Sequence, residues 1–305
     1  MQMSQLTTPK FIIIGAQKCG TTWLWEALQQ HPETDLRVSK DIQFFSVSKV
    51  YRKGLDWYFD RFSHLDTTKV IGDASADYFY DRVLIDNVRE DLSLPVIPEL
   101  ITKALPGAKI IVILRDPVRR AISAYYHHMR RRRYSPFLGL REVEERNPHL
   151  RIVERGHYLR FMELWKRFVP AERLRCFIFE EDVLVSPEET IKATCSFLGL
   201  DPECKLNNVK ESKNRGWGWT HIFLNYYLGP LYGKIHSLLS ITALNEILNL
   251  IDFLPKPEID KNDIDFLRSI YLPEKSELEK LVDRNLDCWD YGSSLTADGL
   301  SRNVG

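Results

Sequence analysis

Short apolar runs separated by longer amphipathic segments make up the main pattern of this chain. Four of these runs predict buried strands, at Phe11–Ile14, Val70–Asp73, Lys109–Leu114 and Leu174–Phe179. The third run, KIIVIL, shows no alternation with polar residues, which is typical of a parallel strand buried on both faces. Strands that alternate with helical segments predict an α/β fold with a central parallel sheet flanked by helices, in the three-layer arrangement of P-loop NTPases.

The helices between these strands are predicted from apolar spacing and from proline and glycine at their ends. Pro117 suits a first helical turn, and Gly199 suits the position after a last one. The expected helices cover about Thr21–Leu28, Trp57–Phe62, Asp81–Asp91, Pro98–Leu105, Val118–Arg132, a segment introduced by Gly156, Tyr158 and Trp165, Pro187–Leu198, a pair within Ile222–Leu254 and a pair within Asp263–Trp289.

Composition excludes several classes of protein. Lysine plus arginine equals aspartate plus glutamate, at 42 each, so no global field would attract nucleic acid or a membrane surface. The five cysteines are odd in number and include no C-x-x-C, which argues against a disulfide framework and a zinc site. The start MQMSQLTTPK lacks the apolar segment of a signal peptide, and no apolar run approaches the roughly 20 residues of a membrane span. We therefore expect a cytoplasmic protein.

The segment Phe11–Leu28 carries the first candidate chemistry. Its strand stops at Gly15, and a loop over Ala16–Gly20 leads into the helix opened by Thr21. Loop amides, the positive end of the helix dipole, the charge of Lys18 and the threonine hydroxyls together predict an anion-binding cradle. A Walker A loop would place its lysine after the second glycine, where Thr21 stands. The alternative is an ordinary strand–turn–helix with a surface lysine.

Three basic features elsewhere could face the same anion. Arg115 follows the third strand, and ligands of open parallel sheets collect at the carboxyl ends of strands, so Arg115 and the cradle should share one crevice. The run Arg130–Arg133 ends a predicted helix and is either a solvated complement to the helix dipole or the rim of an anionic site. The segment Lys210–Trp219, KESKNRGWGW, either closes over a nucleotide or is an exposed turn.

Several motifs together resemble one enzyme family. The segments GAQKCGTTW, RDPVRRAISAY, GHYLRFMELWKRF, FIFEEDV, FLGL and NRGWGW follow one another in the order found in sulfotransferases that use 3′-phosphoadenosine 5′-phosphosulfate (PAPS). The chain is most similar to the heparan-sulfate and bacterial carbohydrate-type branch. The likeness covers nearly the whole chain and weakens over about 222–260, where we expect a variable helical insertion that lines the acceptor cleft. It implies a single sulfotransferase domain over 1–305, with a flexible N-terminus at 1–9.

The resemblance implies a role for each residue that matches a family motif. Lys18 would contact the bridging oxygen and the 5′-phosphate of PAPS. Arg115 and Ser123 would hold the 3′-phosphate, and Trp217 would contact adenine. The implied cofactor-binding set is Lys18, Cys19, Gly20, Thr21, Thr22, Trp23, Arg115, Ser123, Lys213, Arg215, Gly216 and Trp217.

The acceptor side is also implied by the resemblance. DIQFFSVSKVYRKGLDWYFDRF is similar to the sulfotransferase part of the heparan N-deacetylase/N-sulfotransferases, where the residue matching Asp41 is a glutamate that acts as catalytic base. A turn or helix cap is the alternative role for Asp41. Ala74 stands where that family has a second lysine, which departs from the heparan pattern. The acceptor-side candidates are Gln43, Asp73, Tyr78 and Arg130.

The sequence thus predicts a metal-independent sulfotransferase that moves the sulfuryl group of PAPS to a hydroxyl or amine, leaving 3′-phosphoadenosine 5′-phosphate (PAP). Its partner would be a carbohydrate or small-molecule acceptor, with no nucleic acid, and its source would be bacterial. Two alternatives remain open at this point. One is a P-loop kinase-like phosphotransferase, and the other is a nucleotide- or glycan-binding module that has lost catalysis.

Overall fold

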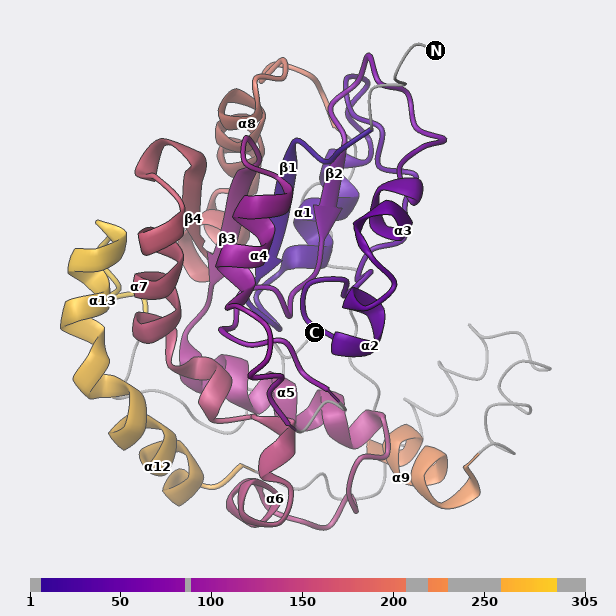
Figure 1. Cartoon of the computed structure of the whole chain (residues 1–305). Helices are drawn as coiled ribbons and strands as arrows, with labels where there is room; N and C mark the ends of the chain where they lie inside the picture. The colour runs from indigo at the N-terminus through magenta and orange to yellow at the C-terminus, as the bar shows by residue number, and fades with distance from the viewer. Residues whose placement is uncertain (1–6, 86–88, 207–218, 230–258, 290–305) are drawn as a thin grey trace. The chain divides into compact units, whose positions relative to one another are not determined.

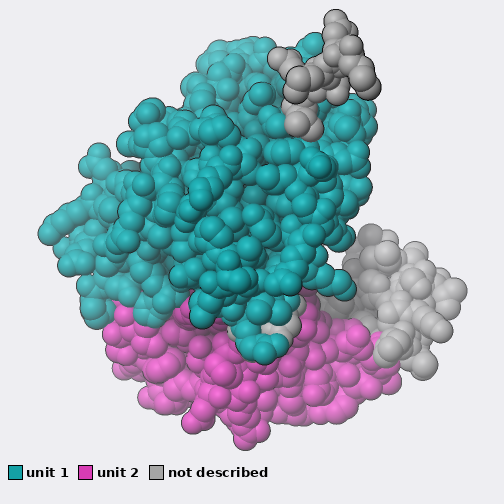
Figure 2. Space-filling model, viewed as in Figure 1, with its two compact units in different colours: residues 1–117, 157–211, 273–290 teal, residues 118–156, 212–272, 291–305 magenta. Residues whose placement is uncertain are grey.

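A computed structural model describes residues 7–85, 89–206, 219–229 and 259–289 of the chain (Figure 1). The chain divides into two compact units (Figure 2). Unit 1 comprises residues 1–117, 157–211 and 273–290, and unit 2 comprises 118–156, 212–272 and 291–305. The predicted single domain over 1–305 stays a prediction. Most of the predicted insertion at 222–260 lies outside the described residues, as does most of the N-terminal segment.

Unit 1 is built on a parallel sheet of four strands in the order β2-β1-β3-β4 (Figure 1). The strands are β1 (Phe11–Gly15), β2 (Gly72–Ala74), β3 (Lys109–Leu114) and β4 (Leu174–Ile178). Phe11 pairs with Gly72 on one side and with Lys109 on the other. A side chain at Gly72 would run into the ring of Phe11, so the small residue allows this close approach. The predicted parallel α/β fold is confirmed.

Helices flank this sheet in two groups. Helix α7 packs against α4 and α13, and α1 packs against α8 (Figure 1). The left-handed conformation of Gly199 ends α8, as its position predicted. The helices of unit 1 are α1 (Thr21–Leu28), α2 (Ser48–Tyr51), α3 (Leu55–Asp60), α4 (Ile97–Ala104), α7 (Tyr158–Phe168), α8 (Pro187–Leu198) and α13 (Lys275–Val282), with a π-helical segment at Phe179–Val185.

The helix predicted over Asp81–Asp91 is wrong. The described residues of this segment make other contacts. The Leu84 amide donates to the Ser46 carbonyl at 2.9 Å, and the Asp91 amide donates back to the Val83 carbonyl of the same segment at 2.7 Å. The buried Asp91 carboxylate accepts from the Ser48 hydroxyl at 2.7 Å and lies 3.1 Å from Arg52. These tertiary partners satisfy groups that a helix would have used, so they override local propensity.

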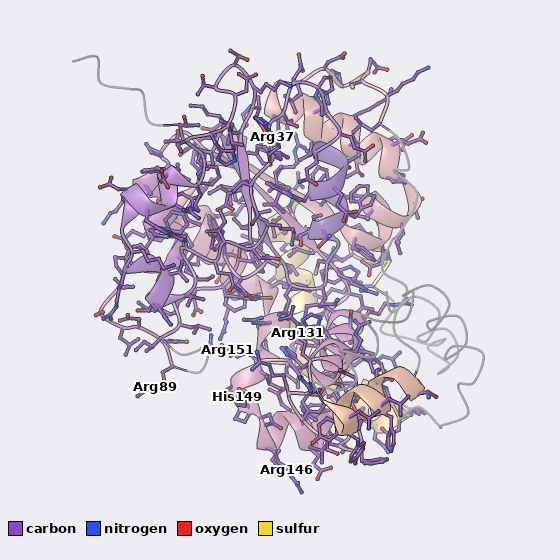
Figure 3. All side chains as sticks on the ribbon, turned by 90° about the vertical axis from the view of Figure 1, so that its right-hand side faces the viewer. Arg37, Arg89, Arg131, Arg146, His149 and Arg151 are labelled. Carbon is purple, nitrogen blue, oxygen red and sulfur yellow. The ribbon has the colours of Figure 1, made fainter. Side chains whose placement is uncertain are left out.

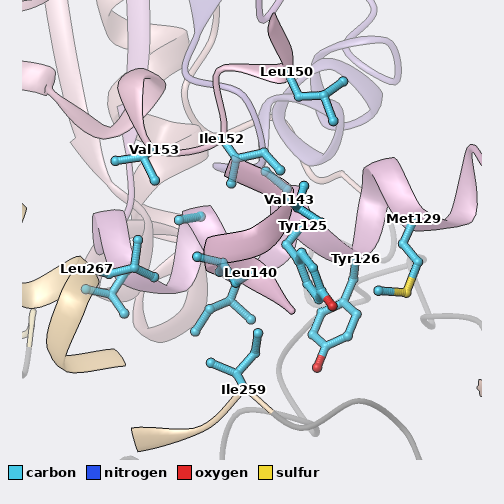
Figure 4. Packing of buried hydrophobic residues seen from close by; sticks show 14 of the residues in the cluster. Tyr125, Tyr126, Met129, Leu140, Val143, Leu150, Ile152, Val153, Ile259 and Leu267 are labelled. Atoms are coloured by element: carbon cyan, nitrogen blue, oxygen red, sulfur yellow. The ribbon is translucent and has the colours of Figure 1, made fainter. Parts of the chain in front are cut away.

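Unit 2 is helical and has its own apolar core (Figure 4). Residues on one face of α5, including Val118, Ile122, Tyr125 and Met129, are buried at the helical spacing that the sequence predicted. The phenol of Tyr271 donates to the Val153 carbonyl at 2.7 Å inside this core. The helices of unit 2 are α5 (Pro117–Arg130, in unit 2 from Val118), α6 (Leu140–Arg146), α9 (Trp219–Leu228) and α12 (Lys261–Tyr271). No helix in the described part of the chain has the length and apolarity to span a membrane.

Candidate active site

The predicted cradle forms at the carboxyl end of β1 in unit 1. Gly15, Lys18 and Gly20 all have positive φ, at 150°, 67° and 88°, so the chain turns sharply between β1 and α1. Gly20 precedes the first residue of α1 and has no side chain that could cap the helix. Its backbone also lies against Phe179, because a Cβ there would be 3.0 Å from that ring. No side chain therefore caps the first amides of α1, which suits binding of an anionic ligand.

Arg115 reaches this loop from the end of β3. The side chain is buried, and its Nη1 donates to the carbonyl oxygen of Lys18 at 3.2 Å. Its guanidinium lies over the ring of Phe179, 4.7 Å from the ring centre. The loop and the carboxyl end of β3 thus lie together, as the rule for parallel sheets predicts. The guanidinium of Arg115 therefore lies against the main chain of the loop that carries Lys18.

Glu180, for which the sequence suggested no role, lies beside Arg115. Its Oε1 is 4.0 Å from Nε of Arg115, and its carboxylate accepts from the Asp116 amide at 3.2 Å and from Nε1 of Trp289 at 3.1 Å. Burial raises the pKa of Glu180 to about 7, with a further increase from the nearby charge of Asp116 and an opposing effect of Arg115. Its position directly after β4 was the available signal, since that strand end faces the same edge as Arg115.

The segment that carries Asp41 is fixed to the chain that follows β2. The Asp41 amide donates to the Ala74 carbonyl at 2.8 Å, and Nε2 of Gln43 donates to the Asp77 carboxylate at 2.9 Å. Asp41 and Gln43 both have positive φ, at 62° and 57°. No helix begins at Asp41. Its side chain is 49% exposed and lies 3.2 Å from Nζ of Lys40, so the carboxylate is available to a ligand.

Asp73 and Tyr78, which were predicted on the acceptor side, are buried beneath this segment instead. Neither side chain has exposed surface. The Asp73 carboxylate accepts from the Tyr58 hydroxyl at 2.8 Å and from the Ala74 amide at 2.7 Å, while the Tyr78 hydroxyl accepts from the Phe44 amide at 3.0 Å. Burial raises the pKa of Asp73 to about 6. The Tyr78 hydroxyl therefore holds the Asp41 segment through the Phe44 amide, and neither side chain forms part of the surface.

The free energy of unfolding should depend on pH because the pKa of Asp73 is raised in the folded protein. In the unfolded chain this carboxyl loses its proton near the ordinary value of 3.8, whereas the folded protein keeps it up to about 6. The folded state therefore holds the extra proton between these values, and its free energy of unfolding falls as pH rises through them. We expect Asp73→Asn to remove this slope, which is worth roughly 3 kcal/mol at most. Urea denaturation of both proteins from pH 4 to pH 8 measures it, and parallel curves would contradict the assignment.

The remaining predicted residues lie in unit 2 or outside the described chain. Ser123 is fully buried in α5, and among the described residues its hydroxyl has no hydrogen-bond partner. Arg130 is half-buried, and burial lowers its pKa. Arg131, Arg132 and Arg133 are exposed after the end of α5. Figure 3 labels Arg131 with three further basic residues of unit 2, Arg146, His149 and Arg151. It also labels Arg37 and Arg89 of unit 1. That Arg115 and Ser123 together bind the 3′-phosphate stays a prediction. Lys213, Arg215, Gly216 and Trp217 lie outside the described residues.

Comparison with known proteins identifies the family. Residues 8–214 match the model of the sulfotransferase domain family, so the chain belongs to it. It is therefore a sulfotransferase, an enzyme that transfers a sulfuryl group, and this family takes that group from PAPS. The predicted family and enzyme class are confirmed, and the kinase-like and binding-module alternatives are not favoured. Within the described residues, no group of three or more acidic, histidine or cysteine side chains could hold a metal ion.

Relatives with known names share modest sequence identity with this chain. It is 26% identical over 290 residues to heparan sulfate glucosamine 3-O-sulfotransferase 5 of Mus musculus, covering 92% of this chain and 73% of that protein. It is 28% identical over 298 residues to bifunctional heparan sulfate N-deacetylase/N-sulfotransferase 3 of Mus musculus, of which it spans only 30%. A sulfotransferase from Alicyclobacillus acidocaldarius has the same fold, with a TM-score of 0.65 and 22% identity over 92% of this chain and 98% of that one.

Proposed function

We propose that this sulfotransferase binds PAPS through the loop at Ala16–Gly20 and Arg115, and delivers its sulfuryl group to a hydroxyl or amine of a glycan or small-molecule acceptor. The observation that carries the proposal is the hydrogen bond from Nη1 of Arg115 to the Lys18 carbonyl, which brings the buried Arg115 guanidinium against the main chain of the loop that leads into α1. PAPS carries a phosphosulfate and a separate 3′-phosphate, so it needs two anion sites at a fixed spacing.

The proposed step is an in-line transfer. The acceptor oxygen or nitrogen attacks sulfur, a new bond to sulfur forms, and the bond between sulfur and the bridging oxygen of PAPS breaks. Negative charge then grows on the leaving phosphate of PAP, where Lys18 and the first amides of α1 would stabilise it. The proton of the acceptor passes to a carboxylate, for which Asp41 is our candidate because it is exposed and rigidly held.

A glycan is the acceptor class that we favour. Two relatives found by sequence are named for heparan sulfate and match 92% and 90% of this chain. Ala74 remains a difference at the acceptor side, so we propose the class and not the particular polysaccharide. We also propose a cytoplasmic location, because the five cysteines of the chain, all of them described, are free.

Replacing Arg115 tests the cofactor assignment. If its guanidinium binds the 3′-phosphate, Arg115→Ala should weaken PAP binding about 10- to 100-fold, the size of a charge-assisted hydrogen bond to phosphate. Binding of adenosine 5′-phosphate, which lacks the 3′-phosphate, should change far less. Isothermal titration calorimetry measures both, with Arg61→Ala, at an exposed arginine directly after α3, as the control. Equal losses for the two nucleotides would remove Arg115 from the 3′-phosphate site, and preference for ATP with Mg²⁺ would contradict the proposed donor.

A further inference from the structure

We propose that Glu180 is a positioning residue for Arg115 and for the cofactor loop, and that Trp289 holds Glu180 in place. This inference rests on the proposed role of Arg115 in binding the cofactor. It adds to the site two residues that do not themselves contact the nucleotide. It also makes the C-terminal part of unit 1 a contributor to cofactor binding.

The orientation of the Arg115 guanidinium is set from three sides. Nη1 donates to the Lys18 carbonyl at 3.2 Å, one face lies over the Phe179 ring, and Nε is directed to Glu180 at 4.0 Å. A planar guanidinium held in this way keeps a defined direction for its remaining donors. Above its pKa, which burial raises to about 7, Glu180 supplies the negative charge in this arrangement, and the side chains of the pair are only 4% and 13% exposed, so solvent screens it little.

Glu180 is in turn held by groups from two distant parts of the chain. The Asp116 amide, directly after Arg115, donates to it at 3.2 Å, and the indole of Trp289 donates at 3.1 Å. Trp289 is 1% exposed and packs near the Tyr158 ring, with 6.0 Å between ring centres. Trp289 is 109 residues from Glu180 in sequence, so only the folded chain brings this donor to the site.

The neighbouring charges single out Glu180 among the acidic residues of its segment. Glu181 and Asp182 pair with Arg284, which lies 2.7 Å and 3.1 Å from them. Their charges are therefore directed to the segment after α13. Asp116 and Cys288 also interact with Glu180. Neither supplies a positive charge, whereas Arg115 is a cation that the described part of the chain places beside Glu180.

The test compares Glu180→Gln with Glu181→Gln as a matched control. Glutamine keeps an oxygen that can accept from Trp289 and Asp116, so the variant should fold, and its melting temperature verifies this. We expect Glu180→Gln to weaken PAP binding about tenfold, the size of one charge-assisted interaction, with less than about twofold change for adenosine 5′-phosphate. With PAPS, KM should rise while kcat stays within about twofold, because a positioning effect on ground-state binding leaves the chemical step intact.

Two further variants separate the possible failures. Trp289→Phe retains the ring and removes its N–H donor, and we expect it to reduce PAP binding in the same selective way. Equal losses for both nucleotides in Glu180→Gln, or the same loss in Glu181→Gln, would reduce Glu180 to a purely structural residue. Normal PAP binding in Glu180→Gln with selective loss in Arg115→Ala would overturn the positioning role and leave the cofactor assignment in place. No selective loss in Arg115→Ala would overturn the proposed function itself.

Discussion

Replacing Lys18 with alanine should lower kcat for sulfuryl transfer about 100- to 1000-fold, as removal of one preorganised charge-stabilising group does in other enzymes. The reason is the position of this residue in the turn before α1, where the proposed leaving phosphate gains negative charge. The ammonium group would stabilise that charge more strongly in the transition state than in bound PAPS. PAP binding should also weaken, but by less than kcat falls. Steady-state kinetics with PAPS and calorimetry with PAP measure the two effects.

The backbone of Lys18 requires a second variant. Lys18 has a φ of 67°, a conformation that alanine adopts less readily than asparagine does. Lys18→Asn therefore removes the charge while tolerating the turn, and it should lose as much activity as Lys18→Ala. Lys10→Ala, which removes an exposed lysine immediately before β1, is the matched control. A Lys18→Asn enzyme with more than a tenth of the normal kcat would contradict the proposed role of this charge.

Replacing Asp41 with asparagine should lower kcat about 10²- to 10⁴-fold, the range for loss of a general base. The amide cannot take the proton of the acceptor, but it has nearly the same shape as the carboxylate and accepts the left-handed φ of 62°. The segment should therefore keep its bond from the Asp41 amide to the Ala74 carbonyl. Cofactor binding should be unchanged, because the proposed contacts of PAPS lie at Lys18 and Arg115.

The experiment on Asp41 combines kinetics with PAP titration. Asp77→Asn is the matched control, because Asp77 supports Gln43 in the same part of the structure without being a candidate base. Asp41→Glu tests how precisely the carboxylate must be placed, because glutamate is one methylene longer than aspartate. The activity of this variant shows whether the reaction depends on that position. Unchanged turnover in Asp41→Asn would move the base to another residue. Loss of PAP binding in the same variant would show that Asp41 serves the cofactor side.

Local patterns along the chain were sufficient to predict the sheet and the turn between β1 and α1. The apolar runs that became β1 and β3 are buried along almost their whole length, and their burial is what selects β-branched and aliphatic residues, whereas β4 is buried only at Phe177 and Ile178. The loop before α1 could be predicted because glycine supplies the required backbone conformations at Gly15 and Gly20. Arg115 could be placed beside that loop because the carboxyl ends of parallel strands share one edge of a sheet.

Long-range contacts decided the remaining features of the site. The segment at 81–91 has helical composition, but among its described residues the Leu84 amide donates to the Ser46 carbonyl and the Asp91 carboxylate accepts from Ser48, so these residues do not form a helix. The family resemblance made Asp73 an acceptor-side candidate, yet it lies within β2, where the Tyr58 hydroxyl and the Ala74 amide satisfy it inside the core. No local sequence pattern predicts such pairs, because the two groups meet only after the chain has folded.

The sequence by itself therefore determined the parallel α/β fold, the sulfotransferase family and the loop that carries Lys18, since strand burial, glycine turns and helix starts act over a few residues. The tertiary structure alone decided that Asp73 is buried against Tyr58, and that Glu180 lies between Arg115 and Trp289. Both depend on burial, which raises the pKa of the two carboxyl groups and requires each to find hydrogen-bond donors from distant segments.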